Sequence, residues 1–349
     1  MGLTDAPVWT GAQAAERLRD PDALEALLDA PALVLDLREP APAPPSLARI
    51  PCPVLGLVRS GATSSWPVDL ALEEDAADTR LLAEDAEAAA AVLVDAAGRA
   101  PAAAAVLAQV LRSTGVLGVE RALVAESAAY SLLLTGPEFQ AWLTSRPVPR
   151  PAAPQERGVR VERDGPVLTL TLERPSVHNA YDASMRDALV QALTLAVLDP
   201  SVQRVVLRGA GPSFCSGGDL RDFGSSTDLV RAHRIRTVRH PGALLHQLAD
   251  RTEARVHGAC IGAGVELPAF AARVVASSDS WFQLPEVAMG TIPGAGGTVS
   301  LPRRIGAQRA LLLALSGIVL PVEDALRWGL VDEIVDERAS EQSERDVSV

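Results

Sequence analysis

The sequence of 349 residues contains no lysine, because all 32 of its basic residues are arginine. Without a lysine amine, the chain can form neither a Schiff base with a substrate nor a Walker-type phosphate loop. Its three cysteines, Cys52, Cys215 and Cys260, lie far apart and form no C-x-x-C pair. A disulfide framework and a structural zinc site are therefore not expected, whereas reduced thiols in the cytoplasm are.

The chain also lacks the features of a membrane or nucleic-acid protein. No run of about 20 apolar residues is uninterrupted, and the N-terminus has no basic stretch followed by an apolar one. The net charge of -12 argues against nucleic acid and anionic membranes as partners. Hydrophobic residues make up 48% of the chain and charged residues 22%, which is ample for a packed core. We therefore expect a soluble protein of about two domains.

Charge and proline content divide the chain near residue 150. Residues 1–150 carry a net charge of -9 and residues 151–349 carry -3. The proline-rich segment between them cannot form a regular helix, because proline lacks a backbone N–H donor. The predicted organisation is an α-rich N-terminal domain over 1–147, a linker over 148–157, a second domain over 158–336 and a polar tail over 337–349.

The two predicted domains differ in their pattern of elements. The first begins with short strands at 32–37 and 54–58 and turns helical from about residue 83, with Gly136-Pro137 ending one helix. The second alternates strands and helices, which predicts an α/β fold. Its expected strands are 167–172, 205–208, 254–256 and 273–276, and its expected helices are 183–198, 228–249 and 262–271. No G-x-G-x-x-G follows its first strand, so nothing favours a dinucleotide fold.

Three segments rich in small residues stand out as candidates for chemistry: FCSGGDL (214–220), HGACIGAGVEL (257–267) and QLPEVAMGTIPGAGGT (283–298). Paired glycines let backbone N–H groups approach a ligand, although a plain tight turn has the same composition. Glu266 and Glu286 are isolated carboxylates among apolar residues. Such a pair suits a reaction in which one carboxylate takes a proton and the other delivers one. Metal binding is not expected, because no histidine lies near Glu286.

One further segment, the predicted helix 228–249, carries Arg231, Arg234, Arg236 and Arg239. The simplest interpretation of this basic face is a solvated surface, and the alternative is a contact for phosphate.

These motifs resemble those of the crotonase (enoyl-CoA hydratase/isomerase) superfamily over about residues 158–336. The resemblance rests on Arg174-Pro175 with Asn179-Ala180, on FCSGGDL, GAGVEL and PEVAMGTIPGAGGT, and on ALRWGLVD (325–332). It implies a core of ββα turns arranged as a spiral. It also implies a coenzyme A thioester as substrate, no separate cofactor, and assembly as a homotrimer or homohexamer.

The resemblance assigns roles to individual residues. The backbone N–H groups of Gly218 and Ala263 would form an oxyanion hole for the thioester oxygen, and Glu266 and Glu286 would be the catalytic pair. The implied substrate-binding residues are Asn179, Ala180, Ser216, Gly217, Asp219, Gly262, Pro293 and Gly294. Possession of both glutamates favours syn hydration of a 2-enoyl-CoA to a 3-hydroxyacyl-CoA.

Three alternatives stay open. One is an enoyl-CoA double-bond isomerase in which a single glutamate, Glu286, shuttles the proton. A second is a biosynthetic crotonase that acts on polyketides or aromatic acids. The third, from another class, is a non-catalytic partner of an active crotonase.

The chain departs from the family pattern at several points. His257 replaces a usual asparagine, and the basic contacts to the coenzyme A phosphates, often lysine in the family, could here only be arginine. Ala263 stands where the family usually has glycine. In addition, the helices that usually follow the "GLV" segment and cover the acyl pocket are missing, while residues 84–147 look like those helices. We hypothesise that the N-terminal domain supplies this cover in permuted order, with its short strands as a degenerate relic of a crotonase half.

Overall fold

The structure is a computed structural model that describes residues 3–42, 46–61, 66–146 and 158–336. The predicted linker 148–157 and polar tail 337–349 lie outside the described residues. The chain divides into two compact units. Unit 1 comprises Met1–Ser145, Pro285–Ile292 and Gly306–Ile318, and unit 2 comprises Arg146–Leu284, Pro293–Ile305 and Val319–Val349. Two segments from the second half of the chain therefore belong to unit 1, an arrangement that composition along the chain does not reveal.

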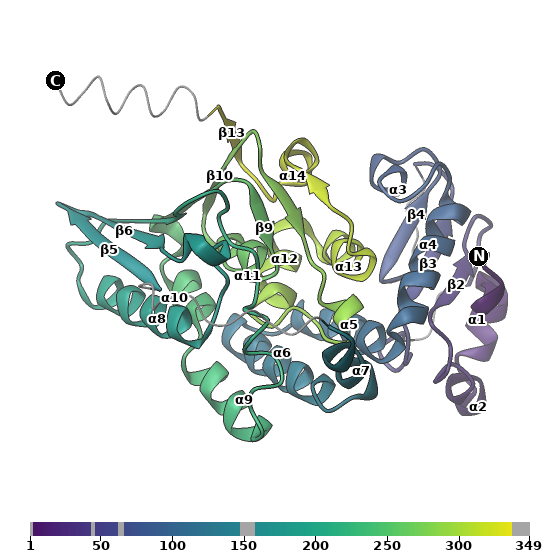
Figure 1. Cartoon of the computed structure of the whole chain (residues 1–349). Helices are drawn as coiled ribbons and strands as arrows, with labels where there is room; N and C mark the ends of the chain where they lie inside the picture. Colours follow the sequence, from purple (N-terminus) through teal and green to yellow (C-terminus); the bar gives the residue numbers. More distant parts are fainter. Residues whose placement is uncertain (1–2, 43–45, 62–65, 147–157, 337–349) are drawn as a thin grey trace. The chain divides into compact units, whose positions relative to one another are not determined.

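Unit 1 contains a parallel sheet of four strands that lie in chain order (Figure 1). The strands are β1 (Val8–Thr10), β2 (Leu33–Asp36), β3 (Val54–Val58) and β4 (Leu70–Glu73). The predicted strands 32–37 and 54–58 correspond to β2 and β3, whose nearly complete burial explains their continuous apolar runs. β1 has only three residues, which is too short for an alternating pattern to be recognised, whereas β4 does alternate but was not predicted. The N-terminal region is thus α/β, with more sheet than the sequence analysis expects.

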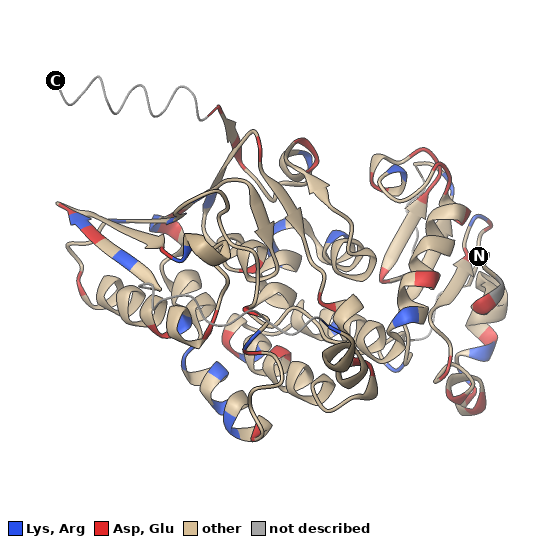
Figure 2. Cartoon of the chain, in the orientation of Figure 1, with Lys and Arg blue, Asp and Glu red and all other residues tan. Residues whose placement is uncertain are grey.

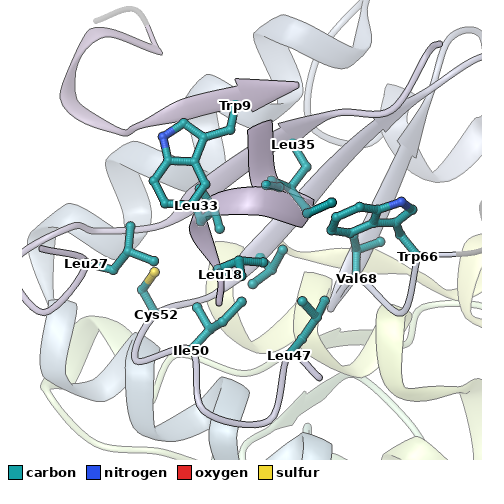
Figure 3. Close-up of a cluster of buried hydrophobic side chains, with 13 residues drawn as sticks. Trp9, Leu18, Leu27, Leu33, Leu35, Leu47, Ile50, Cys52, Trp66 and Val68 are labelled. Atoms are coloured by element: carbon teal, nitrogen blue, oxygen red, sulfur yellow. The ribbon is translucent and has the colours of Figure 1, made fainter. Parts of the chain in front are cut away.

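The core of unit 1 includes a cluster of buried side chains around this sheet (Figure 3). Its labelled members are Trp9, Leu18, Leu27, Leu33, Leu35, Leu47, Ile50, Cys52, Trp66 and Val68. Burial raises the pKa of the Cys52 thiol to about 12. This cysteine is therefore protonated at neutral pH and serves as a small apolar side chain.

Helices make up most of the rest of unit 1. They are α1 (Gly11–Arg17), α2 (Pro21–Glu25), α3 (Ala77–Arg80), α4 (Ala86–Arg99), α5 (Pro101–Thr114), α6 (Val119–Leu133), α7 (Pro137–Ser145) and α13 (Ala307–Ser316), with the 3-10 helices η1 (Leu3–Asp5) and η5 (Val287–Met289). The predicted helical region corresponds to α4–α7. Proline occupies the first position of α5 and of α7, where its missing N–H costs nothing.

α13 lies within the second half of the sequence but packs against α4, α5 and β4 of unit 1. The alanines of α4 and α5 that are fully buried allow close packing between helices. Two polar contacts add to the interface: Gln308 Oε1 accepts a hydrogen bond from the Ala71 N–H (3.2 Å), and Arg309 pairs with Asp78 (2.8 Å). Residues 1–145 thus provide a surface against which α13 packs.

Among the described residues, no single helix has the length and apolarity needed to cross a membrane. α4 and α5 taken together have that length and apolarity, but the chain bends by 111° between them.

Unit 2 is built on two sheets. The larger has the order β13-β10-β8-β7-β6-β5 and is parallel apart from the β5–β6 hairpin, and the smaller has the order β12-β11-β9. The strands are β5 (Val159–Asp164), β6 (Val167–Leu172), β7 (Arg204–Gly209), β8 (Thr252–Val256), β9 (Ala259–Ile261), β10 (Arg273–Ser277), β11 (Trp281–Gln283), β12 (Leu320–Pro321) and β13 (Glu333–Val335). The four predicted strands of this region correspond to β6, β7, β8 and β10.

The helices of unit 2 are α8 (Ala183–Leu198), α9 (Leu229–Val238), α10 (Pro241–Gln247), α11 (Ala263–Glu266), α12 (Gly297–Ile305) and α14 (Val322–Trp328), with the 3-10 helices η2 (Pro175–Val177), η3 (Ala249–Arg251) and η4 (Pro268–Phe270). Asp182 caps α8 by accepting the Met185 N–H at 2.8 Å. α8 and α10 pack together, and α8 also contacts β5 and β6 (Figure 1).

Two predicted helices are wrong in their extent. The helix expected over 228–249 is two helices that meet at His240-Pro241, and the helix expected over 262–271 ends before Pro268. Before Pro241, His240 is extended (φ -110°, ψ 108°), because a proline disfavours helical geometry at the residue before it. Leu267 keeps helical geometry (φ -71°, ψ -48°), and the chain continues from Pro268 as the 3-10 helix η4, since this proline has no N–H to donate to the preceding turn.

Candidate active site

Two segments of the glycine-rich motifs run side by side in unit 2. Cys215 pairs with Cys260 in a parallel bridge, in which the Cys215 N–H donates to Ala259 O and the Ile261 N–H donates to Cys215 O (3.2 and 2.9 Å). A Cβ at Gly264 would lie 2.5 Å from Cys215 O, so only glycine permits this approach. The segment that ends in Gly218 is thereby held against the segment that begins α11.

The backbone amides of Gly218 and Ala263 are the two predicted oxyanion-hole donors. Neither N–H donates a hydrogen bond to any other described residue. Ala263 is the first residue of α11, where an amide has no intrahelical acceptor. Its predecessor Gly262 has φ 50° and ψ -117°, a conformation that favours glycine, and its own N–H is used by Gln283 O (3.0 Å). Two free donors on adjacent segments are what stabilisation of an oxyanion requires.

Glu266 lies one turn further along α11 and is only 2% exposed. Its Oε2 accepts hydrogen bonds from the N–H groups of Ala295 (2.7 Å) and Gly297 (2.8 Å). Its Oε1 accepts none from the described residues. Burial raises the pKa of Glu266 to about 7, although the two backbone hydrogen bonds act in the opposite direction. The carboxylate is thus held by one oxygen and is poised to exchange a proton near neutral pH.

The loop that holds Glu266 depends on its glycines. A Cβ at Gly297 would lie 2.7 Å from Glu266 Cγ, and one at Gly296 would lie 2.6 Å from the ring of Phe270. Gly296 also has φ +108°, which other residues rarely adopt. The GAGG sequence of the loop is therefore required to bring two backbone amides to one carboxylate oxygen.

Asn179, the only asparagine in the chain, holds the FCSGGDL segment in place. Its side chain is fully buried, and its Nδ2 donates to the carbonyl oxygens of Ala210, Ser213 and Phe214 (2.8 to 3.1 Å). Its Oδ1 accepts the Arg174 N–H at 2.8 Å. All polar atoms of this amide contact backbone, so the side chain acts as a structural link beside the site.

Arg174 and Asp219 form a buried ion pair directly next to Gly218. Arg174 is 7% exposed and Asp219 is 5% exposed, and their nearest side-chain atoms are 3.0 Å apart. Arg174 also donates to Ala180 O and pairs with Asp182 (2.9 Å). Burial opposes ionisation of Asp219, but hydrogen bonds from Arg221 and Arg174 lower its pKa to about 2. Asp219 is thus a charged residue that anchors the segment containing Gly218.

The remaining predicted binding residues of unit 2 surround these groups. The Ser216 N–H donates to His178 O (2.9 Å), and Gly217 O accepts the Tyr181 N–H (2.7 Å). A Cβ at Gly217, which has φ +89°, would lie 3.1 Å from Ile261 O. Pro293 and Gly294 precede the two amides that hold Glu266. The structure therefore gathers the first, second and third motifs, apart from residues 285–292, in one unit.

Tyr181 is a residue that the sequence analysis does not single out. Its backbone bonds to Gly217 and Asp219 on either side of Gly218. Burial raises the pKa of its phenol, and the charge of nearby Glu266 adds to the increase. It is thus a neutral tyrosine next to the carboxylate. Its position directly after Asn179-Ala180 and the scarcity of tyrosine, with two in the chain, are the signals that could have identified it.

Glu286, the second predicted carboxylate, belongs to unit 1 and is 9% exposed. Its backbone carbonyl accepts the N–H groups of Met289 (3.0 Å) and Thr291 (3.1 Å), which close the turn of η5. The residue is therefore buried in a hydrogen-bonded turn.

The basic face predicted on 228–249 is carried by α9. Figure 2 shows the basic residues along this helix, of which Arg231 and Arg234 are exposed. No group of three or more His, Cys, Asp or Glu side chains suited to a metal ion occurs among the described residues.

Comparison of the sequence with known protein families assigns the chain to one of them. The model of the enoyl-CoA hydratase/isomerase family matches residues 162–347. The chain belongs to the enoyl-CoA hydratase/isomerase family. This confirms the superfamily that the motifs indicate and the α/β fold class of residues 158–336.

Relatives of this family member include hydratases and an isomerase. It is 36% identical to the 2,3-dehydroadipyl-CoA hydratase of Escherichia coli, over 50% of this chain and 68% of that one. It is 34% identical to the mevalonyl-coenzyme A hydratase of Beauveria bassiana, over 50% of this chain and 65% of that one. It is also 34% identical to the 1,2-epoxyphenylacetyl-CoA isomerase of Escherichia coli, over 49% and 67%. The chain thus spans a little under two thirds of the fungal hydratase.

Proposed function

We propose that this enoyl-CoA hydratase/isomerase family member catalyses the syn addition of water to a 2-enoyl-CoA, which yields a 3-hydroxyacyl-CoA. The observation that carries the proposal is the environment of Glu266. This buried carboxyl has a pKa of about 7 and one oxygen held by two amides, and it shares α11 with the free N–H of Ala263. A proton-transfer group is therefore built beside a donor for a developing negative charge.

In the proposed reaction, the thioester oxygen accepts hydrogen bonds from the Gly218 and Ala263 amides. Water attacks Cβ and loses a proton to one glutamate, electrons move to the thioester oxygen, and Cα then takes a proton from the other glutamate. The net result is the addition of H and OH across the double bond. The family resemblance assigns the two proton-transfer roles to Glu266 and Glu286. The buried, rigid placement of each carboxylate within its own unit supports those roles.

The names of the relatives support hydration and also keep isomerisation as a second candidate. Two of the three relatives described above are named hydratases, and the third is named an isomerase. The isomerase is named for an epoxide substrate, whereas the second candidate is an enoyl-CoA double-bond isomerase. Such an enzyme moves one proton between two carbons and adds no water, so it needs a single carboxylate. The presence of both Glu266 and Glu286 favours hydration over this alternative.

A substrate comparison tests the proposal. We expect the full chain to remove the conjugated-thioester absorbance of crotonyl-CoA, with formation of 3-hydroxybutyryl-CoA. Conversion of a 3-enoyl-CoA without turnover of the 2-enoyl compound would replace hydration by isomerisation. Absence of turnover with short-, medium- and long-chain and aromatic enoyl-CoA thioesters would contradict an acyl-CoA enzyme and favour a non-catalytic partner.

We also propose that the N-terminal helices serve as the helical cover of the family-matched region. The packing of α13 on α4, α5 and β4 supports this, because α13 lies inside residues 162–347 while its packing surface lies outside them. We expect residues 151–349 expressed alone to be insoluble or unfolded, since α13 would expose its buried leucines. Solubility and circular dichroism measure this, and a stable, active fragment would contradict the proposal.

A further inference from the structure

The turn that carries Glu286 packs against the N-terminal part of the chain. Residues Pro285–Ile292 belong to unit 1, and η5 within them contacts both α7 and α13. α7 ends at Ser145, so it lies outside the family-matched residues 162–347. A catalytic segment of the family motif is therefore in contact with a helix that the family match does not include.

The contact is closest at Gly290. This residue has φ +74°, and a Cβ placed on it would lie 2.4 Å from Phe139 N and 2.6 Å from the carbonyl carbon of Glu138. Both neighbours are backbone atoms, which cannot rotate away as a flexible side chain can. Phe139 is only 1% exposed, and its ring stacks on Trp142. The backbone of the first turn of α7 is thus in close contact with the turn that follows Glu286.

The first turn of α7 is itself anchored. The carboxylate of Glu138 accepts the N–H groups of Ala102 (2.7 Å) and Ala103 (3.0 Å) at the start of α5. These amides have no acceptor within their own helix, so a carboxylate from another helix satisfies them and is favoured by the helix dipole. Glu138 therefore fixes α7 to α5 at the residue next to the Gly290 contact.

Backbone hydrogen bonds within the η5 turn link Gly290 to Glu286. The Gly290 N–H donates to Val287 O (2.9 Å), and the Thr291 N–H donates to Glu286 O (3.1 Å). Thr291 is fully buried. Displacement of Gly290 would thus pull on the backbone of Glu286 through a closed hydrogen-bonded turn.

We propose that α7 is a positioning element for Glu286, with Glu138, Phe139 and Gly290 as the residues through which it acts. The N-terminal helices then do more than cover apolar surface, because they fix the orientation of a proton-transfer group. The catalytic consequence rests on the proposed function, whereas the structural part, that α7 holds the turn, does not.

Gly290→Ala tests the catalytic part, and Gly329→Ala is its matched control. The two glycines have similar left-handed conformations (φ +74°, ψ 25° and φ +80°, ψ 15°), but nothing lies within 4 Å of a Cβ at Gly329. Both variants carry the same backbone strain, and only Gly290→Ala displaces α7. We expect kcat for crotonyl-CoA to fall about 10- to 100-fold in Gly290→Ala with KM within about threefold, and to change little in Gly329→Ala. Equal kcat values in the two folded variants would overturn the proposal.

Hydrogen–deuterium exchange tests the structural part without using the reaction. We expect the amides of 289–291, which donate hydrogen bonds within the turn, to exchange faster in Gly290→Ala and in Glu138→Ala than in the wild type, and to remain protected in Gly329→Ala. Glu138→Gln, which keeps an acceptor for Ala102 or Ala103, should restore most of the protection lost in Glu138→Ala. Unchanged exchange in both Gly290→Ala and Glu138→Ala would refute the positioning role. If the wild type turned over no acyl-CoA, the proposed function would fail, and the exchange data would still decide whether α7 holds the turn.

Discussion

Replacement of Glu266 by glutamine is expected to lower kcat for hydration by about 10²- to 10⁴-fold, the usual contribution of a positioned acid–base group. Glutamine has the shape of glutamate and keeps an oxygen that can accept the Ala295 and Gly297 amides, so the loop should remain in place. The loss should therefore appear in kcat more than in KM. Steady-state kinetics with crotonyl-CoA measure it, and residual activity within tenfold of the wild type would contradict the assignment.

The same variant gives a stability control with a defined sign. The pKa of Glu266 is raised from 4.5 to about 7 in the folded protein, mainly by burial. Between these values the folded state binds more protons than the unfolded state, so this group stabilises the fold at low pH. Its contribution is lost as pH rises through about 7, by up to about 3 kcal/mol. Thermal unfolding should show this decline in the wild type but not in Glu266→Gln.

The pH dependence of kcat assigns the role of Glu266. A limb that rises through about pH 7 identifies it as the base that takes a proton from water, because the base must be ionised. A falling limb at the same pH identifies it as the acid that protonates Cα. The limb should disappear in Glu266→Gln, and Glu286→Gln should retain it. A profile without a limb near pH 7 would show that the ionisation of Glu266 does not control the reaction.

Local sequence patterns predict those parts of the fold that depend on neighbouring residues. β6 occupies 167–172 as predicted, since alternation of apolar residues with threonine is a property of the strand itself. α8 occupies 183–198 as predicted, since its cap, Asp182, is adjacent to it. The two long predicted helices were wrong in extent at Pro241 and Pro268, although each proline is a local signal for the end of a regular helix.

The features that could not be predicted from the sequence depend on contacts between residues far apart in the chain. Glu266 is marked as a candidate by its isolation in an apolar stretch, yet its pKa depends on burial and on amides 29 and 31 residues further along the chain. The ion pair of Arg174 and Asp219 joins residues 45 positions apart, and neither pattern nor spacing indicates that Arg174 is buried. The packing of α13 and of the Glu286 turn within unit 1 is similarly invisible, because it joins segments more than 140 residues apart.

Replacement of Ala263 by proline removes its amide N–H, and this is expected to lower kcat by about 10²- to 10³-fold. Proline lacks the N–H, and the first position of a helix tolerates proline because its φ is already suitable there. In addition, the Ala263 N–H donates to no other described residue, so no internal hydrogen bond is lost. The expected size of the effect is that of deleting one oxyanion-hole donor.

Ala263→Gly is the matched control for this substitution. Glycine keeps the N–H and is the residue that the family usually has at this position, so kcat should stay within a few-fold of the wild type. Both variants should unfold at temperatures close to that of the wild type, which thermal unfolding checks. A proline variant that folds and retains hydration within a few-fold would exclude the Ala263 amide from the oxyanion hole. That result would also remove the main reason for placing thioester chemistry at α11, because the Gly218 amide alone would then have to stabilise the enolate.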